Sequence, residues 1–97
     1  MSMKSEKAEQ VYLLLKSMNN YINLFDSPEE TLEIINKLQQ FRKVHPFHGN
    51  ILYFTYVENL PLKIVAEKMG YSYGHIRDEH STALKKFYQY IPGNYLQ

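Results

Sequence analysis

Apolar residues recur along the first half of the chain at steps of three and four, which is the spacing of an amphipathic helix. The first such stretch predicts a helix over about 5–25. Its apolar stripe comprises Val11, Leu14, Leu15, Met18, Ile22 and Phe25. A second predicted helix begins near DSPEE, where Ser27 suits the cap and Pro28 the first helical position. Its apolar face is expected to hold Leu32, Ile35, Leu38 and Phe41, with Ile34 beside them.

Three shorter helices are predicted in the second half of the chain. His45 precedes a proline, so the HPFHGN stretch is expected to interrupt the helical pattern. The helices that follow are predicted over about 49–58, 62–69 and 72–90. Gly70 suits the left-handed position after the second of these, and Ser72 suits the cap of the third.

These elements predict an all-α fold of about five helices in a single domain, 1–97. Residues 1–45 would form an N-terminal helical hairpin, 46–91 a helix-turn-helix unit, and 92–97 a short tail. The connections between the predicted helices are short, which favours a compact arrangement with the hairpin packed on the C-terminal unit.

The C-terminal unit meets the steric demands of a helix-turn-helix, in which two helices cross closely around a tight turn. Ala66 gives the first helix a small residue at the crossing, and Gly70 tolerates a positive φ in the turn. Ile76 fixes the second helix inward. Further inward residues are expected to be Val65, Met69, Leu84 and Phe87.

Residues 51–87 resemble region 4 of bacterial sigma-70 factors and their relatives, through the segments YVENLPL, IVAEKMGYS and ALKKF. Within that group the chain is most similar to small phage and prophage transcriptional regulators of the autolysin-regulatory-protein type. The resemblance implies a DNA-binding regulator of phage late genes in the cytoplasm of a bacterial host cell, with contact to the host RNA polymerase as a further implication.

The resemblance also implies that the helix beginning at Ser72 enters the major groove of double-stranded DNA. Its outward residues would be Tyr73, Gly74, His75, Arg77, Asp78 and Ser81. Arg77 would pair with guanine, and Asp78 would accept from a cytosine amine. Phosphate contacts would come from Ser72, Tyr73, Lys63 and Lys85 or Lys86.

Four positions depart from the family pattern: Ile64, Gly74, Glu79 and His80. Ile64 replaces a charged residue. Glu79 and His80 replace an apolar anchor, so these two side chains are expected to point partly toward the first helices and not into the groove. The net charge of +1 gives little bulk attraction for nucleic acid.

A second function therefore stays open: a protein-interaction module that binds a repressor, an RNA polymerase subunit or a replication protein through Ile64, Tyr73, Asp78 and Glu79. A common face formed by the basic residues would favour DNA, and interruption of that face by acidic residues would favour a protein partner. The basic residues in question are Lys63, Lys68, Arg77, Lys85 and Lys86.

Little in the sequence indicates catalysis or a cofactor. There is no cysteine, so neither a disulfide nor a thiolate metal site is available. His45 and His48 lie in a predicted loop, whereas His75 and His80 lie on different helix faces, so we expect no metal site. Glycine-rich phosphate loops and nucleophile elbows are absent, and we expect no enzyme activity.

Apolar stretches are too short for a membrane span. An exposed stripe on the first helix would serve a homodimer on a two-part DNA site.

Overall fold

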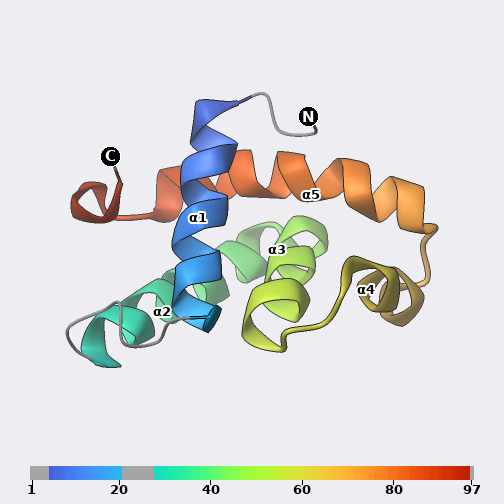
Figure 1. Cartoon of the computed structure of the whole chain (residues 1–97), viewed down its shortest axis with the longest axis horizontal. Helices are drawn as coiled ribbons and strands as arrows, with labels where there is room; N and C mark the ends of the chain where they lie inside the picture. Colours follow the sequence, from blue (N-terminus) through green and yellow to red (C-terminus); the bar gives the residue numbers. More distant parts are fainter. Residues whose placement is uncertain (1–4, 21–27, 97) are drawn as a thin grey trace.

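The computed structural model describes residues 5–20 and 28–96 (Figure 1). These residues form five α-helices and no strand, which confirms the predicted all-α class. The helices are α1 (Glu6–Asn20), α2 (Pro28–Val44), α3 (Pro46–Leu52), α4 (Leu62–Met69) and α5 (Tyr73–Phe87). A π-helical segment, η2 (Tyr53–Val57), follows α3, and two 3-10 turns, η3 (Tyr88–Tyr90) and η4 (Gly93–Tyr95), follow α5.

The two N-terminal helices pack on different elements of the rest of the molecule. In Figure 1, α5 forms the upper edge, α1 crosses its C-terminal half, and α4 lies below its N-terminal end. The main partners of α1 are α5 and η2, whereas α2 packs chiefly on α3. The expected hairpin is thus held together through C-terminal elements more than by direct pairing of α1 with α2.

The buried residues form two hydrophobic clusters. The larger cluster joins α1 and α2 to the second half of α5, and its fully buried members include Leu15, Phe41 and Phe87. The smaller cluster contains Ile51, Val65, Ala66 and Ile76 and lies between α3, α4 and the start of α5. The helix-turn-helix therefore has a small core of its own, while α5 extends into the main core.

The corner between α2 and α3 differs from the prediction. The interruption at HPFHGN is limited to His45, whose φ of −127° and ψ of 75° leave the helical region, and Pro46 restarts the chain as the first residue of α3. Gly49 lies inside α3 at its close approach to α2, where a Cβ would be 2.5 Å from the Cα of Arg42, so the position requires glycine. The α-helix ends at Leu52 and the chain continues as the π-helical η2 to Val57. The predicted helix over 49–58 therefore starts too late, but its end agrees with the end of the helical stretch.

The N-terminal predictions have mixed outcomes. The backbone N–H of Ala8 donates to Ser5 Oγ at 3.3 Å, so Ser5 does help to start α1. Ile22, Phe25 and Ser27 lie outside the described residues. In α2, Ile34 is fully buried and Leu32 is 56 % exposed, so the predicted face was rotated: Ile34, Leu38 and Phe41 are its centre.

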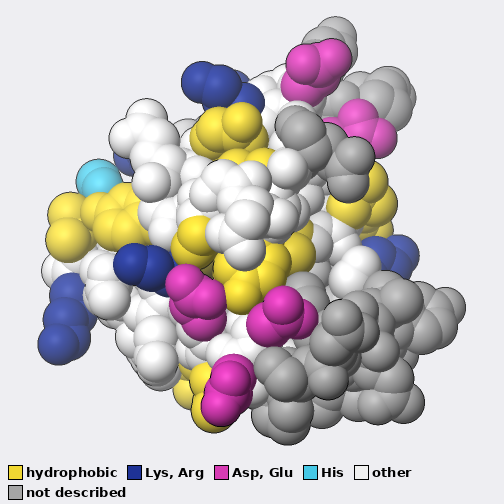
Figure 2. Space-filling model, turned by 90° about the vertical axis from the view of Figure 1, so that its left-hand side faces the viewer, with side chains coloured by type: hydrophobic (Ala, Val, Ile, Leu, Met, Phe, Trp, Pro, Cys, Tyr) yellow, Lys and Arg dark blue, Asp and Glu magenta, His cyan; other side chains and the backbone are white. Residues whose placement is uncertain are grey.

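Acidic side chains gather at the end of the molecule where α2 begins. Figure 2 views this end and shows acidic side chains beside hydrophobic ones, with one basic side chain next to them and others toward the margins. Glu29 and Glu30 stand in the first turn of α2, and Glu33 accepts a 2.8 Å hydrogen bond from the Tyr95 hydroxyl. This acidic end lies opposite the N-terminus of α5 along the long axis in Figure 1. No helix among the described residues is long and apolar enough to cross a membrane.

Candidate nucleic-acid interface

The turn between α4 and α5 is closed by backbone hydrogen bonds. Gly70 has φ 81° and ψ 30°, the left-handed conformation predicted for it. Its N–H donates to the carbonyls of Ala66 and Glu67, and the N–H of Tyr71 donates to Ala66 at 2.9 Å. This is the Schellman arrangement, which satisfies the last carbonyls of α4 and sends the chain off at a steep angle.

The start of α5 is fixed by a side-chain cap at its N-terminus and by buried contacts on its inner side. Ser72 Oγ accepts a 3.1 Å hydrogen bond from the backbone N–H of His75, which confirms the predicted cap. Ile76 is fully buried and Ala66 is nearly so, and both pack with Val65 and Ile51. The inward residues of the predicted helix-turn-helix are therefore confirmed, and the helix start is rigidly positioned.

Four of the predicted DNA contacts share one side of α5, which we call the outer face: Gly74, Asp78, Ser81 and Lys85. They follow one another at steps of four, three and four, and so lie in one row opposite Ile76. Asp78 and Lys85 are exposed, and Gly74 and Ser81 are half-buried.

Arg77 lies at the edge of this row. Its guanidinium is 5.6 Å from the centre of the Tyr73 ring, and its Nε is 3.6 Å from Asp78 Oδ1. Tyr73 is 44 % exposed. The structure thus brings Tyr73, Arg77 and Asp78 together, and these are the predicted base-reading and phosphate-contacting groups.

The remaining predicted contacts lie to the sides. His75 belongs to an aromatic group with Tyr71 and Phe47, with ring centres 5.4 and 5.7 Å away. Lys63 is exposed on α4. These side chains flank the outer face and do not belong to its row.

The basic residues do not form one continuous face. Lys68 Nζ lies 3.9 Å from Glu58 and 4.9 Å from the centre of the Phe54 ring, so it turns toward η2. Lys86 turns toward α3. Lys85 stands on the outer face in the same row as Asp78. The outer face therefore carries charges of both signs.

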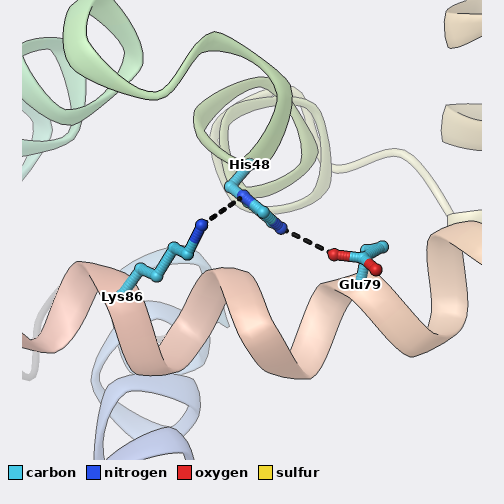
Figure 3. Close-up of polar contacts among 3 residues, drawn as sticks. All are labelled: His48, Glu79 and Lys86. Carbon is cyan, nitrogen blue, oxygen red and sulfur yellow. Dashed lines mark hydrogen bonds and ion pairs between the residues drawn. The ribbon is translucent and has the colours of Figure 1, made fainter.

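A polar bridge connects α5 with α3 (Figure 3). His48 Nε2 lies 2.7 Å from Glu79 Oε1, and His48 Nδ1 lies 3.4 Å from Lys86 Nζ. A neutral imidazole with its hydrogen on Nε2 satisfies both contacts, because it donates to the carboxylate and accepts from the ammonium. The hydrogen bond from His48 holds the pKa of Glu79 below its usual value.

A second polar contact fixes the opposite flank of α5. The hydroxyl of Tyr56 lies 2.7 Å from His80 Nε2, and the two rings stack at 5.7 Å. Burial lowers the pKa of His80 to about 4, and burial followed by the nearby Tyr12 raises the pKa of Tyr56. Both groups are therefore neutral near pH 7, as expected for a hydrogen-bonded pair in a poorly hydrated site.

Glu79 points to α3 and His80 to η2, so both turn away from the outer face as expected, but their hydrogen-bond partners lie on these elements and not on the first helices. Their partners were missed because His48 and Tyr56 are 31 and 24 positions away in the chain. The sequence offered one signal: two polar residues at positions where the family that the chain resembles has an apolar anchor. Such a signal indicates that a partner is needed without saying which residue supplies it.

Within the described ranges, no three His, Asp or Glu side chains gather closely enough to hold a metal ion. Comparison of the chain with protein-family models, with curated proteins and with solved structures finds no match. The resemblance of residues 51–87 to sigma region 4 rests on its own motifs and stays a prediction.

Proposed function

We propose that this protein is a sequence-specific DNA-binding transcriptional regulator that inserts the N-terminal half of α5 into the major groove. The observation that carries this proposal is the outer face of α5. It starts at a capped, rigid helix N-terminus, and α1 covers only the C-terminal half of the helix (Figure 1). A major groove about 12 Å wide accepts a helix presented in this way.

Charge distribution supports the orientation. The acidic side chains at the start of α2 lie at the far end of the long axis from the N-terminus of α5, so they would point away from the phosphates (Figure 2). This separation would keep the acidic end away from the duplex, while the outer face itself carries charges of both signs. In this proposal Ser72, Tyr73 and Lys85 contact phosphates, and Arg77 contacts a base edge.

The test is selection of binding sites from a randomised DNA duplex, followed by titration of the selected duplex across a salt series. We expect Arg77→Ala to weaken binding by about 1–3 kcal/mol and to relax preference at one base pair. Lys85→Ala should weaken binding to all DNA sequences alike. It should also reduce the slope of the logarithm of the binding constant against the logarithm of salt concentration by about one. Sedimentation of the complex would show whether one or two copies bind a two-part site.

Lys43→Ala supplies the matched control for Lys85→Ala. Lys43 is an equally exposed lysine in the last turn of α2, away from the outer face. Its removal changes the net charge by the same amount and should leave the salt slope at the wild-type value. An equal change in slope for both variants, or no complex at low salt, would contradict the proposed interface.

The second candidate function, a protein-interaction module, is favoured by the mixed charge of the outer face and by exposed apolar groups beside it. Ile64 is 42 % and Tyr73 is 44 % exposed, and Asp78 interrupts the basic residues. A photo-crosslinking residue at position 73 would capture such a partner in cells. The same residue at position 32, where Leu32 is 56 % exposed on α2, is the control. Crosslinks to one protein from position 73 alone, without DNA binding, would favour this alternative.

A further inference from the structure

A pocket of about 280 Å³ opens between α1, η2 and α5. Tyr12 and Lys16 line it from α1, Thr55 and Tyr56 from η2, and His80 from α5. Its volume is close to the lower end of small-molecule sites in proteins, roughly 300 Å³. The pocket is separate from the outer face of α5, since its α5 wall is the inward-turned His80.

Three irregular features of the backbone and side chains meet at this pocket. One wall is η2, and π-helical segments inside helices are rare and frequent at functional sites. Asn59, another lining residue, has a positive φ of 61°. The Thr55 hydroxyl oxygen is buried and has no hydrogen-bond partner. A buried polar atom without a partner is unusual in a folded protein and calls for an explanation.

The walls define the chemistry of a fitting molecule. The rings of Tyr12 and Tyr56 meet edge to face with centres 6.4 Å apart, and Leu62 adds an aliphatic wall. These surfaces suit a flat, apolar body. Lys16 Nζ donates to the Tyr12 hydroxyl at 3.0 Å and brings a positive charge to this rim. Because His80 and Tyr56 are neutral, Lys16 is the ionised group among the lining residues the structure describes.

We propose that this pocket is a binding site for a small aromatic carboxylate of about one ring, with the ring against Tyr12, Tyr56 and Leu62 and the carboxylate toward Lys16. Rotation about χ1 of Thr55 exchanges its methyl and hydroxyl groups, and threonine in a helix populates two such rotamers. A rotation that brings the hydroxyl to the pocket would let the ligand supply the partner that it lacks. A bound molecule would contact α1, η2 and α5 at once. The proposal does not depend on DNA binding by the outer face.

The test uses the full chain, uniformly labelled with ¹⁵N, and titration with benzoate followed by amide chemical shifts. We expect saturable shifts at residues of α1, η2 and α5 around the pocket, with a Kd in about the millimolar range. Benzamide has the same ring without the charge, and should bind roughly fivefold more weakly. Lys16→Gln should weaken the binding of benzoate and leave that of benzamide unchanged, so the difference in affinity between the two compounds should disappear.

Thr55→Val separates binding from folding. The substitution keeps the shape of the side chain and removes the unpartnered hydroxyl, so the midpoint of thermal unfolding should stay level or rise. Binding of benzoate should weaken by about fivefold, because the hydroxyl contact is lost. Thr31→Val is the matched control, since the Thr31 hydroxyl on α2 is also buried without a partner and Thr31 is not among the lining residues. It should change stability in the same direction and leave binding unchanged.

Saturable shifts around the pocket, together with weaker binding in Thr55→Val and unchanged binding in Thr31→Val, would support the site. Three results would overturn it: no saturable shift for benzoate at about 20 mM, shifts centred elsewhere on the protein, or equal affinity in the two valine variants.

Discussion

The inner and outer faces of α5 both contain charged or titratable residues, but these residues differ in their partners and in their exposure to solvent. On the inner side Glu79 and His80 are each within 2.7 Å of a partner on another element. On the outer side Asp78 and Lys85 are exposed, and among the described residues Arg77 interacts with Tyr73 and Asp78 on its own helix. Side chains of the first kind hold α5 in place, and those of the second kind stay accessible to another molecule.

The contrast shows that residue type alone does not indicate the role of a residue on a helix, because the role depends on the partners of its side chain. Glu79 follows Asp78 directly in the chain, and both carry a carboxylate. The first is half-buried against His48, and the second is exposed on the outer face. The four predictions below test the contrast between the two faces, in order of decreasing expected effect.

The largest effect is expected from the apolar part of the inner face. Phe87 is fully buried, with the Phe41 ring centre 5.3 Å and the Tyr90 ring centre 6.3 Å away. Phe87→Ala should lower the free energy of unfolding by about 3–5 kcal/mol, because it removes buried surface and leaves a cavity. Urea unfolding measures this. Tyr73→Ala, on the exposed side of the same helix, should change it by less than about 0.5 kcal/mol.

The next effect concerns the buried imidazole of His80. Its pKa is about 4 in the folded protein and 6.5 in an unperturbed chain, so only the unfolded state takes up a proton as the pH falls between these values. The folded protein should therefore lose roughly 3 kcal/mol of stability across this window. His80→Gln removes the titrating group, so its free energy of unfolding should fall much less over the same range.

Urea unfolding at several pH values between about 7 and 4 would measure the His80 effect. His75→Gln, which removes an exposed histidine earlier in α5, is the control for the loss of a histidine. Equal slopes for wild type and His80→Gln would show that His80 is not held neutral in the folded protein.

A smaller effect of opposite sign is expected on the outer face. A Cβ at position 74 would meet only Arg77 Nη2, at 3.9 Å, so alanine fits there without strain. Gly74→Ala should raise the free energy of unfolding by about 0.5–1 kcal/mol, because it restricts the unfolded chain and favours the helix. The same change should weaken DNA binding if the backbone of Gly74 approaches the duplex. A gain in both stability and affinity would contradict close backbone approach at this residue.

The smallest effect is expected at the bridge from Glu79 to His48. Glu79→Gln keeps a side-chain acceptor for His48 and removes the charge, so the free energy of unfolding near pH 7 should fall by less than about 1 kcal/mol. Because the pKa of Glu79 is lowered by folding, its contribution is complete above its ordinary value of 4.5 and is lost as the pH falls through the folded value.

The stability of Glu79→Gln should therefore converge with that of wild type as the pH falls below 4.5, at and beyond the acidic end of the window assigned to His80. Asp78→Asn, next in the chain but exposed, supplies the comparison. Parallel curves for Glu79→Gln and wild type at all pH values would contradict the assigned bridge.

The sequence by itself determined the helices and the turn at the centre of the candidate site. The range of α4, the left-handed Gly70, the Ser72 cap and the inward Ile76 all follow from signals within a few residues of one another. Local steric rules are sufficient for such features, because a positive φ, a cap or a helical period is encoded by neighbouring residues. The resemblance to sigma region 4, and not these local rules, gave Tyr73, Arg77 and Asp78 as outward residues, and all three are exposed on α5.

Tertiary structure alone decided where the polar side chains point. Lys86 turns to His48, His80 to Tyr56, and Lys68 to Glu58, each through a partner distant in the chain or across an irregular segment. It also decided that Ile34 replaces Leu32 in the core and that α3 begins at Pro46, next to α2. The physical reason is that the hydrogen bonds and close contacts involved depend on distances of a few ångströms between separate elements, which no local pattern specifies.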